Sequence, residues 1–114
     1  MSAIKEIRKK YDCKEKLRDL CKSVAAELES GKVSAYDYLD KVYDIEWITH
    51  RDHTYRAAML LVAGGGPTVW INTMTNTVEG SWWGDTFNYF YTDKIDLDEC
   101  LREMHKNETA VLTS

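Results

Sequence analysis

Five segments rich in β-branched and aromatic residues, joined by very short links, constrain this chain more than any other feature. Such residues are enriched in β-strands, and the links contain the Gly, Pro, Asn and Asp that are typical of turns. A parallel crossover needs about a dozen residues or more, so these links allow only antiparallel neighbours. We therefore expect an antiparallel meander of four or five strands, over Ile45–His50, Tyr55–Ala63, Thr68–Thr73, Thr77–Trp83 and Thr86–Tyr91.

Residues 2–30 have a helical pattern, but their apolar residues form two stripes on different helix faces. Asp12 lies between the stripes and is followed three residues later by a glutamate, which is the form of an N-terminal capping box. The pattern predicts one helix ending near Tyr11 and a second over Cys13–Ser30, with one continuous helix as the alternative. Gly31 is a natural stop, because glycine readily adopts the left-handed conformation that ends helices.

Two further helices are predicted from their capping residues. Ser34 with an aspartate three residues later predicts a short helix to about Tyr43. Asp96 is predicted as the N-cap of a final helix that carries an apolar stripe and ends near Asn107. The predicted fold class is α+β, with N-terminal helices, the antiparallel sheet and one C-terminal helix.

The chain has 114 residues, which is typical of one domain. We expect a single domain with a helical part at 1–43, the sheet at 44–92, the last helix at 95–107 and a frayed tail at 108–114. No apolar run reaches the roughly 20 residues of a membrane helix, and no signal core precedes the charged N-terminal residues. These patterns predict a cytoplasmic protein. The positions predicted for its core are Leu20, Val24, Leu28, Leu39, Leu61, Val69, Ile71, Leu97 and Leu101.

The net charge of −4 is unevenly distributed along the chain. Residues 1–32 carry nine basic and six acidic side chains, whereas residues 33–114 carry six basic and thirteen acidic ones. Duplex DNA requires a continuous basic face, so this pattern does not favour direct nucleic-acid binding. The three cysteines form no CxxC pair, which argues against a disulfide framework and a structural zinc site and favours buried thiols.

The nearest approach to a catalytic motif is the sequence His50-Arg51-Asp52-His53. Two imidazoles and a carboxylate are ligands that a catalytic metal uses, so a small metal-dependent hydrolase is the alternative function. The three residues fall in a predicted hairpin turn, which does not fix both rings on one side as a helix would. A solvated turn is the favoured interpretation, and we assign no metal, cofactor or catalytic residue.

Aromatic residues on the last two predicted strands are the main candidates for a binding site. Because strand side chains alternate between faces, Trp82 and Trp83 cannot both enter one core, and neither can Tyr89 and Phe90. Helices therefore cover both faces, or one face presents aromatics to a partner. The alternation predicts a patch around Trp82 with Tyr89 or around Trp83 with Phe90, with Asp85 beside it.

Acidic residues near these aromatics are most simply interpreted as an ordinary acidic surface that aids solubility. The alternative hypothesis is that they match the charge of a partner. An acidic rim is suited to a basic surface, such as that of a nucleic-acid-binding protein. A homodimer through the same patch is an open alternative. The rim is expected to consist of Glu79, Asp85, Asp93, Asp96 and Asp98, opposed by Lys94 alone.

The segment Gly65-Gly66-Pro67-Thr68-Val69-Trp70-Ile71-Asn72-Thr73, followed by Val78-Glu79-Gly80-Ser81-Trp82-Trp83-Gly84-Asp85, resembles small uncharacterised proteins of Gram-positive phages and mobile elements. The resemblance covers about a fifth of the chain and carries no catalytic residues. It implies a mobile-element accessory protein, and many such proteins block host defence nucleases, as anti-CRISPR proteins do. The expected function is a non-catalytic protein-binding module of this kind.

Overall fold

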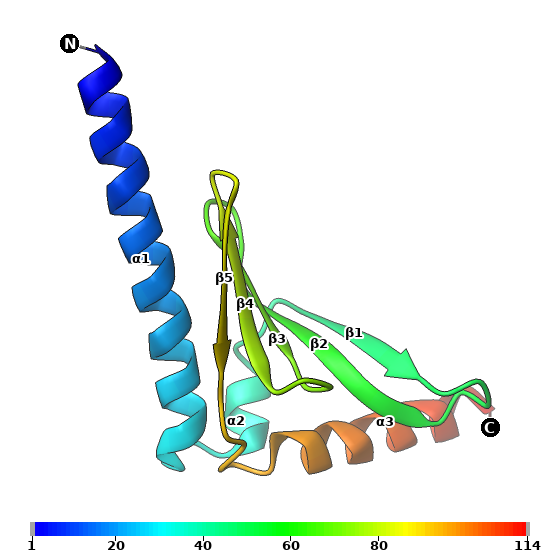
Figure 1. The fold of residues 1–114 in the computed structure, drawn as a ribbon. Helices are drawn as coiled ribbons and strands as arrows, with labels where there is room; N and C mark the ends of the chain where they lie inside the picture. The colour runs from blue at the N-terminus through cyan, green and yellow to red at the C-terminus, as the bar shows by residue number, and fades with distance from the viewer. Residues whose placement is uncertain (1, 114) are drawn as a thin grey trace.

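The computed structural model describes the backbone of residues 2–113 and the side chains of residues 14–108. These residues form an α+β fold with a five-stranded antiparallel sheet, so the predicted fold class is confirmed (Figure 1). The strands pair in chain order, β1-β2-β3-β4-β5, as a meander. The elements are α1 Ser2–Ser30, α2 Ala35–Leu39, β1 Asp44–Thr49, β2 Tyr55–Ala63, β3 Thr68–Asn72, β4 Thr77–Trp82, β5 Asp85–Phe90 and α3 Leu97–Thr113.

The helices pack against one face of the sheet. Helix α1 lies along β4 and β5, and α3 lies under β2, with α2 beside α3 (Figure 1). Buried side chains from both layers form one hydrophobic cluster, which includes Leu17 and Leu28 of α1, Ile71 of β3 and Leu101 of α3. Within the described residues, no helix has both the length and the apolarity that crossing a membrane requires.

Residues 2–30 form one continuous helix, so the prediction of two helices is wrong and its stated alternative is correct. The residues around Asp12 include many Lys, Arg, Glu and Leu, which are strong helix formers, and no Gly or Pro interrupts them. The helix propensity of the residues on both sides of Asp12 therefore outweighs the local capping signal. The predicted stop at Gly31 is confirmed by its φ of +68°.

The second helix begins as predicted but ends earlier. The Ser34 hydroxyl accepts a hydrogen bond from the backbone N–H of Asp37 at 3.2 Å, so the predicted cap is confirmed. The helix ends at Leu39 rather than near Tyr43. The reason is that the Tyr43 N–H donates to the carbonyl oxygen of Leu61 at 2.8 Å, which already aligns the chain with β2.

Helix α3 is capped by Asp93, which corrects the prediction that the side chain of Asp96 serves as its N-cap. The two carboxylate oxygens of Asp93 accept hydrogen bonds from the N–H groups of Leu97 at 2.9 Å and Asp98 at 3.0 Å. Asp96 has a φ of +56°, whereas N-cap residues ordinarily have β-region dihedrals. This left-handed residue turns the chain so that the earlier aspartate reaches the helix end.

The same helix extends to Thr113, past the predicted end near Asn107. No Gly or Pro follows Asn107, and an asparagine alone is a weak stop signal. The helix therefore continues into the segment that was expected to fray.

Seven of the nine predicted core positions are buried, and Leu20 and Leu61 are only half-buried. Leu61 pairs with Trp70 and points away from the helices, whereas Leu60 pairs with Ile71 and is fully buried. Two adjacent leucines on one strand cannot both face the core, and the sequence pattern selected the wrong one. The confirmed positions are Val24, Leu28, Leu39, Val69, Ile71, Leu97 and Leu101.

A β-bulge at the start of β2 turns Tyr55 toward α3. The register shifts by one residue there, so Tyr55 rather than its neighbour pairs with Thr49. The Tyr55 hydroxyl donates to Asp98 Oδ1 at 2.6 Å, and its ring lies edge-on to Trp47 at 6.1 Å between centroids. Burial, together with the hydrogen bond to Asp98, raises the pKa of the Tyr55 phenol well above its usual range. The contact joins α3 to the sheet.

Gly80 on β4 allows the closest contact between α1 and the sheet. A Cβ at this position would lie 2.5 Å from Cys21 Sγ and 2.8 Å from a methyl carbon of Leu17. Both of those side chains are fully buried. The absence of a side chain at residue 80 therefore sets how closely the helix approaches the sheet.

We expect Gly80→Ala to lower the free energy of unfolding by about 1–3 kcal/mol, because the added methyl overpacks this contact. Gly64→Ala is the matched control, since a Cβ there would meet no atom within 4 Å. Adding Cys21→Ala to Gly80→Ala should restore part of the loss by removing the nearest atom. Urea denaturation measures all three variants. Equal stabilities for the Gly80 and Gly64 variants would contradict the close packing.

Candidate functional site

The structure places the predicted aromatic residues in four different environments. Trp82 is half-buried against the core. Trp83 is 68% exposed because β4 ends at Trp82, one residue before its predicted end, and places Trp83 in the β4–β5 turn. Tyr89 faces the α1 side and is 37% exposed, whereas Phe90 faces the opposite side and is 76% exposed. Asp85 is half-buried at the base of the hairpin turn.

The strand register separates these residues along the hairpin. Trp82 pairs with Asp85 beside the turn, whereas Phe90 pairs with Thr77 at the other end. Trp83 and Phe90 therefore lie at opposite ends of the hairpin. Trp82 and Tyr89 share a face, but four residues along the strands separate their ladder positions. Neither predicted pair lies close together as the centre of one compact patch.

The predicted acidic rim is also divided among several roles. Asp93 caps α3, and Asp98 accepts the hydrogen bond from Tyr55. Asp98 also lies 3.8 Å from Arg102 on the same helix. Only Glu79 and Asp85 remain close to the strands that carry the aromatics.

The sheet face opposite the helices, which we call the open face, carries a second group of side chains that sequence analysis did not assign. None of the described helices packs on it, because their contacts and the shared core lie on the other face. The strand register assigns to it Asp44, Glu46, Ile48, Ala57, Met59, Leu61, Thr68, Trp70, Asn72, Thr77, Glu79, Ser81, Thr86, Asn88 and Phe90.

The open face combines apolar side chains with acidic ones. Leu61, Trp70 and Glu79 form one continuous row across three strands, and all three are half-buried. Asp44 and Glu46 on the edge strand add two further carboxylates, and none of the residues that the register assigns to the open face is Lys or Arg. Arg56 lies at the β2 bulge, outside the paired register. Period-two alternation through Trp70 was the signal available in the sequence, but it did not reveal which face the helices cover.

Glu79 has an unsatisfied carboxylate oxygen at the centre of this face. Its Oε2 atom is buried and has no hydrogen-bond partner among the described residues. A buried carboxylate oxygen without a donor is energetically costly, and native proteins rarely retain one. A cationic donor brought by a partner would satisfy it with a charge-assisted hydrogen bond.

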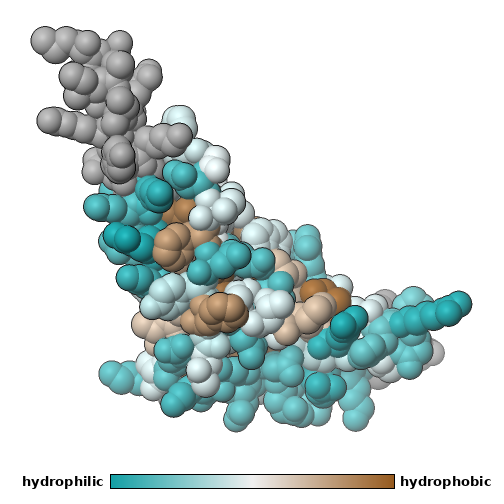
Figure 2. Space-filling model, viewed as in Figure 1, coloured by the Kyte–Doolittle hydropathy of each residue, from teal (hydrophilic) through white to brown (hydrophobic). Residues whose placement is uncertain are grey.

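The apolar surface on the side of the molecule seen in Figure 2 is dispersed. Figure 2 shows apolar residues in separate small areas between hydrophilic side chains on the side of the molecule seen there, not as one continuous patch. Isolated exposed apolar residues are normal for a globular protein and by themselves indicate no binding site.

Trp83 adopts a backbone conformation that is unfavourable for a bulky residue. Its φ is +53°, and the following Gly84 has φ of +79°, so both central residues of the two-residue turn are left-handed. Asn and Gly are preferred at such positions, and a bulky side chain is an outlier there. With 68% of its surface exposed, Trp83 gains little packing to offset this cost.

Trp83→Asn is expected to raise the free energy of unfolding by about 1 kcal/mol, because asparagine tolerates the left-handed turn. Trp82→Asn should lower the free energy of unfolding, since Trp82 packs against the core. Chemical denaturation of the two variants gives the comparison. Destabilisation by Trp83→Asn would mean that this ring supports the fold and is not retained at the hairpin tip for another role.

The His50–His53 segment forms the β1–β2 turn. Asp52 Oδ1 accepts hydrogen bonds from the Thr54 hydroxyl at 2.6 Å and the Thr54 N–H at 3.1 Å. These bonds lower the pKa of the Asp52 carboxyl. Within the described part of the chain, no group of three or more His, Cys, Asp or Glu side chains is placed to hold a metal ion. The carboxylate therefore organises the turn.

The cysteines show no reactive environment where they are described. Cys21 and Cys100 are buried and unpaired, and burial raises the pKa of each thiol. A raised pKa leaves little thiolate, the nucleophilic form, at neutral pH. Cys13 lies outside the residues whose side chains are described.

Comparison of the chain with protein-family models, with curated proteins and with solved structures finds no match. The functional argument therefore depends on the residues of the open face and of the β4–β5 hairpin.

Proposed function

We propose that this protein is a non-catalytic protein-binding module whose open face binds a partner with a basic surface. The observation that carries the proposal is the buried, unpartnered Oε2 of Glu79 within an apolar and acidic sheet face. A Lys or Arg of the partner would pair with Glu79. Apolar partner groups would cover Trp70, Leu61 and the exposed ring of Phe90.

The composition of the open face supports binding in preference to catalysis. Half-buried Met59, Leu61 and Trp70 offer apolar area, and aromatic residues are frequent interface hot spots. Asp44 and Glu46 lie near the edge of the face, where charges increase the rate of association with a basic partner.

The partner class that we propose is a nucleic-acid-binding protein, such as a defence nuclease. Its nucleic-acid channel is basic, and an acidic protein that occupied this channel would block the substrate. Inhibition of a host nuclease also agrees with the resemblance to proteins of phages and mobile elements.

Site-specific photo-cross-linking tests this proposal. A benzophenone amino acid in place of Phe90 should cross-link the partner in cells that express it, because residue 90 lies on the open face. The matched control has the same group in place of Tyr36, which is 65% exposed on α2. We expect a cross-linked partner from position 90 only, attached through a surface rich in Lys and Arg.

A charge-removing variant tests the role of Glu79. Glu79→Gln should reduce the cross-linked partner by tenfold or more, since a hydrogen bond to a charged group contributes about 1.5–3 kcal/mol. Glu103→Gln on the exposed surface of α3 is the matched control and should have no effect. Three outcomes would each overturn the proposal. Cross-linking could be equal from positions 36 and 90, or its yield could be unchanged by Glu79→Gln. The cross-links could also join only a second copy of this chain.

A further inference from the structure

A basic stripe on α1 lies alongside β5, away from the open face. Lys14, Arg18 and Lys22 follow one another at four-residue intervals, so they lie along one side of the helix. All three side chains are exposed. Among the described residues, no carboxylate lies within ion-pair distance of any of them. The stripe therefore presents three positive charges that are in no ion pair with the described residues.

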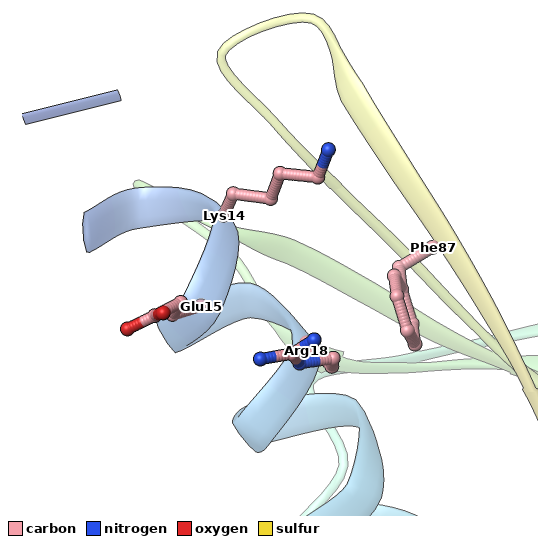
Figure 3. Close-up of a pocket in the computed structure, with 4 residues that line it drawn as sticks. All are labelled: Lys14, Glu15, Arg18 and Phe87. Carbon is pink, nitrogen blue, oxygen red and sulfur yellow. The ribbon is translucent and has the colours of Figure 1, made fainter. Parts of the chain in front are cut away.

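Aromatic side chains of β5 face this stripe. Lys14, Glu15 and Arg18 line a pocket of about 200 Å³ together with Phe87, and the Glu15 carboxylate points away from the Phe87 ring (Figure 3). Further along the helix, Lys22 Nζ lies 5.9 Å from the centroid of the Tyr89 ring. The groove between α1 and β5 is thus basic on the helix side and aromatic on the strand side.

Strand β5 is also an edge strand of the sheet. Trp82 and Asp85 flank a two-residue turn, so the backbone groups of Phe87 and Tyr89 point to β4 and those of the alternate residues point outward. The bond from the Tyr91 N–H to the Asn76 carbonyl oxygen, at 3.0 Å, fits this alternation. The edge contains no Lys, Pro or bulge, the features that usually block strand addition.

Helix α1 reaches this edge only beyond β5, where Glu29 Oε1 accepts a hydrogen bond from the Thr92 N–H at 3.0 Å. The position of Gly80 shows that Leu17 and Cys21 of the helix lie over the face of the neighbouring strand β4. The basic stripe, in contrast, borders β5. A strand added beside β5 would run past the stripe.

We propose that the β5 edge binds an extended acidic peptide as a sixth strand, with carboxylates at alternate positions paired with Lys14, Arg18 and Lys22. The spacings agree: residues i and i+4 of a helix are about 6 Å apart along its axis, and residues i and i+2 of a strand are about 6.6 Å apart. Helix α1 and β5 run alongside each other (Figure 1). Each basic residue of the stripe can therefore lie opposite one of the alternate carboxylates of the peptide. Backbone hydrogen bonds would hold the peptide, and charge would select it.

Charge favours an acidic peptide over a second copy of the chain as the strand added to the β5 edge. Two β5 edges joined across a twofold axis would bring two basic stripes to the same side of the combined sheet, where they repel each other. Single-stranded nucleic acid would satisfy the positive charge and could stack on an aromatic ring. It has no peptide backbone, however, and would leave the strand edge unpaired.

Fluorescence anisotropy with synthetic peptides tests this proposal. The probe is a labelled ten-residue peptide in which Glu alternates with Thr or Val. One comparator is a peptide of the same composition with its glutamates clustered. The other is a peptide of the same sequence in which alternate backbone amides are N-methylated. We expect the alternating peptide to bind at least tenfold more tightly than either comparator. The charge-reversal variant Arg18→Glu should weaken binding tenfold or more, whereas Lys16→Glu, on another side of α1, should change it less than twofold.

Each departure from this pattern would overturn the proposal. Equal binding of the N-methylated peptide would mean that charge alone acts, without strand addition. Tighter binding of a labelled oligothymidylate would assign the groove to nucleic acid. No binding of the alternating peptide to the folded parent protein at millimolar peptide concentration would exclude the site. If the unliganded protein sediments as a dimer paired through its β5 edges, and the peptide does not dissociate this dimer, the edge would be assigned to self-association.

Discussion

The contact of α1 with Gly80 is the constraint on which the rest of the structure depends. Because residue 80 has no side chain, Leu17 and Cys21 can approach the strand and become fully buried. This contact places the long N-terminal helix on the same face as α3, and the two helices share one core with the sheet. The opposite face is left without a helical layer among the described residues.

The one-sided packing separates charge into two regions with different chemistry. The charged residues that the strand register assigns to the open face are all acidic: Asp44, Glu46 and Glu79. Next to β5, the exposed side of α1 carries Lys14, Arg18 and Lys22. A small protein with two such surfaces can contact a basic partner and an acidic segment at the same time, because the surfaces lie on different sides of the hairpin.

Local patterns predicted the strands to within a residue or so at most boundaries, because short links and period-two alternation are local signals. They failed at the start of α3, where the left-handed Asp96 lets the nearby Asp93 cap the helix. They also failed in the core, where the position of the helices selects Leu60 and not Leu61. The site was predicted only in part. Alternation predicted that Trp82 and Trp83 do not share one core, although it is the turn that exposes Trp83. The unpartnered Glu79 oxygen depends on which face the helices cover, which is a tertiary property.

The exposure of the open face can be measured directly with hydroxyl-radical footprinting of the unliganded protein, read residue by residue by mass spectrometry. Phe90 and Tyr91 are neighbours on opposite faces, and they are 76% and 5% exposed. The one-sided packing predicts rapid oxidation of Phe90 and strong protection of Tyr91, although the two rings are similarly reactive. Equal protection of both residues in the monomer would contradict it, because a further layer would then have to cover the second face.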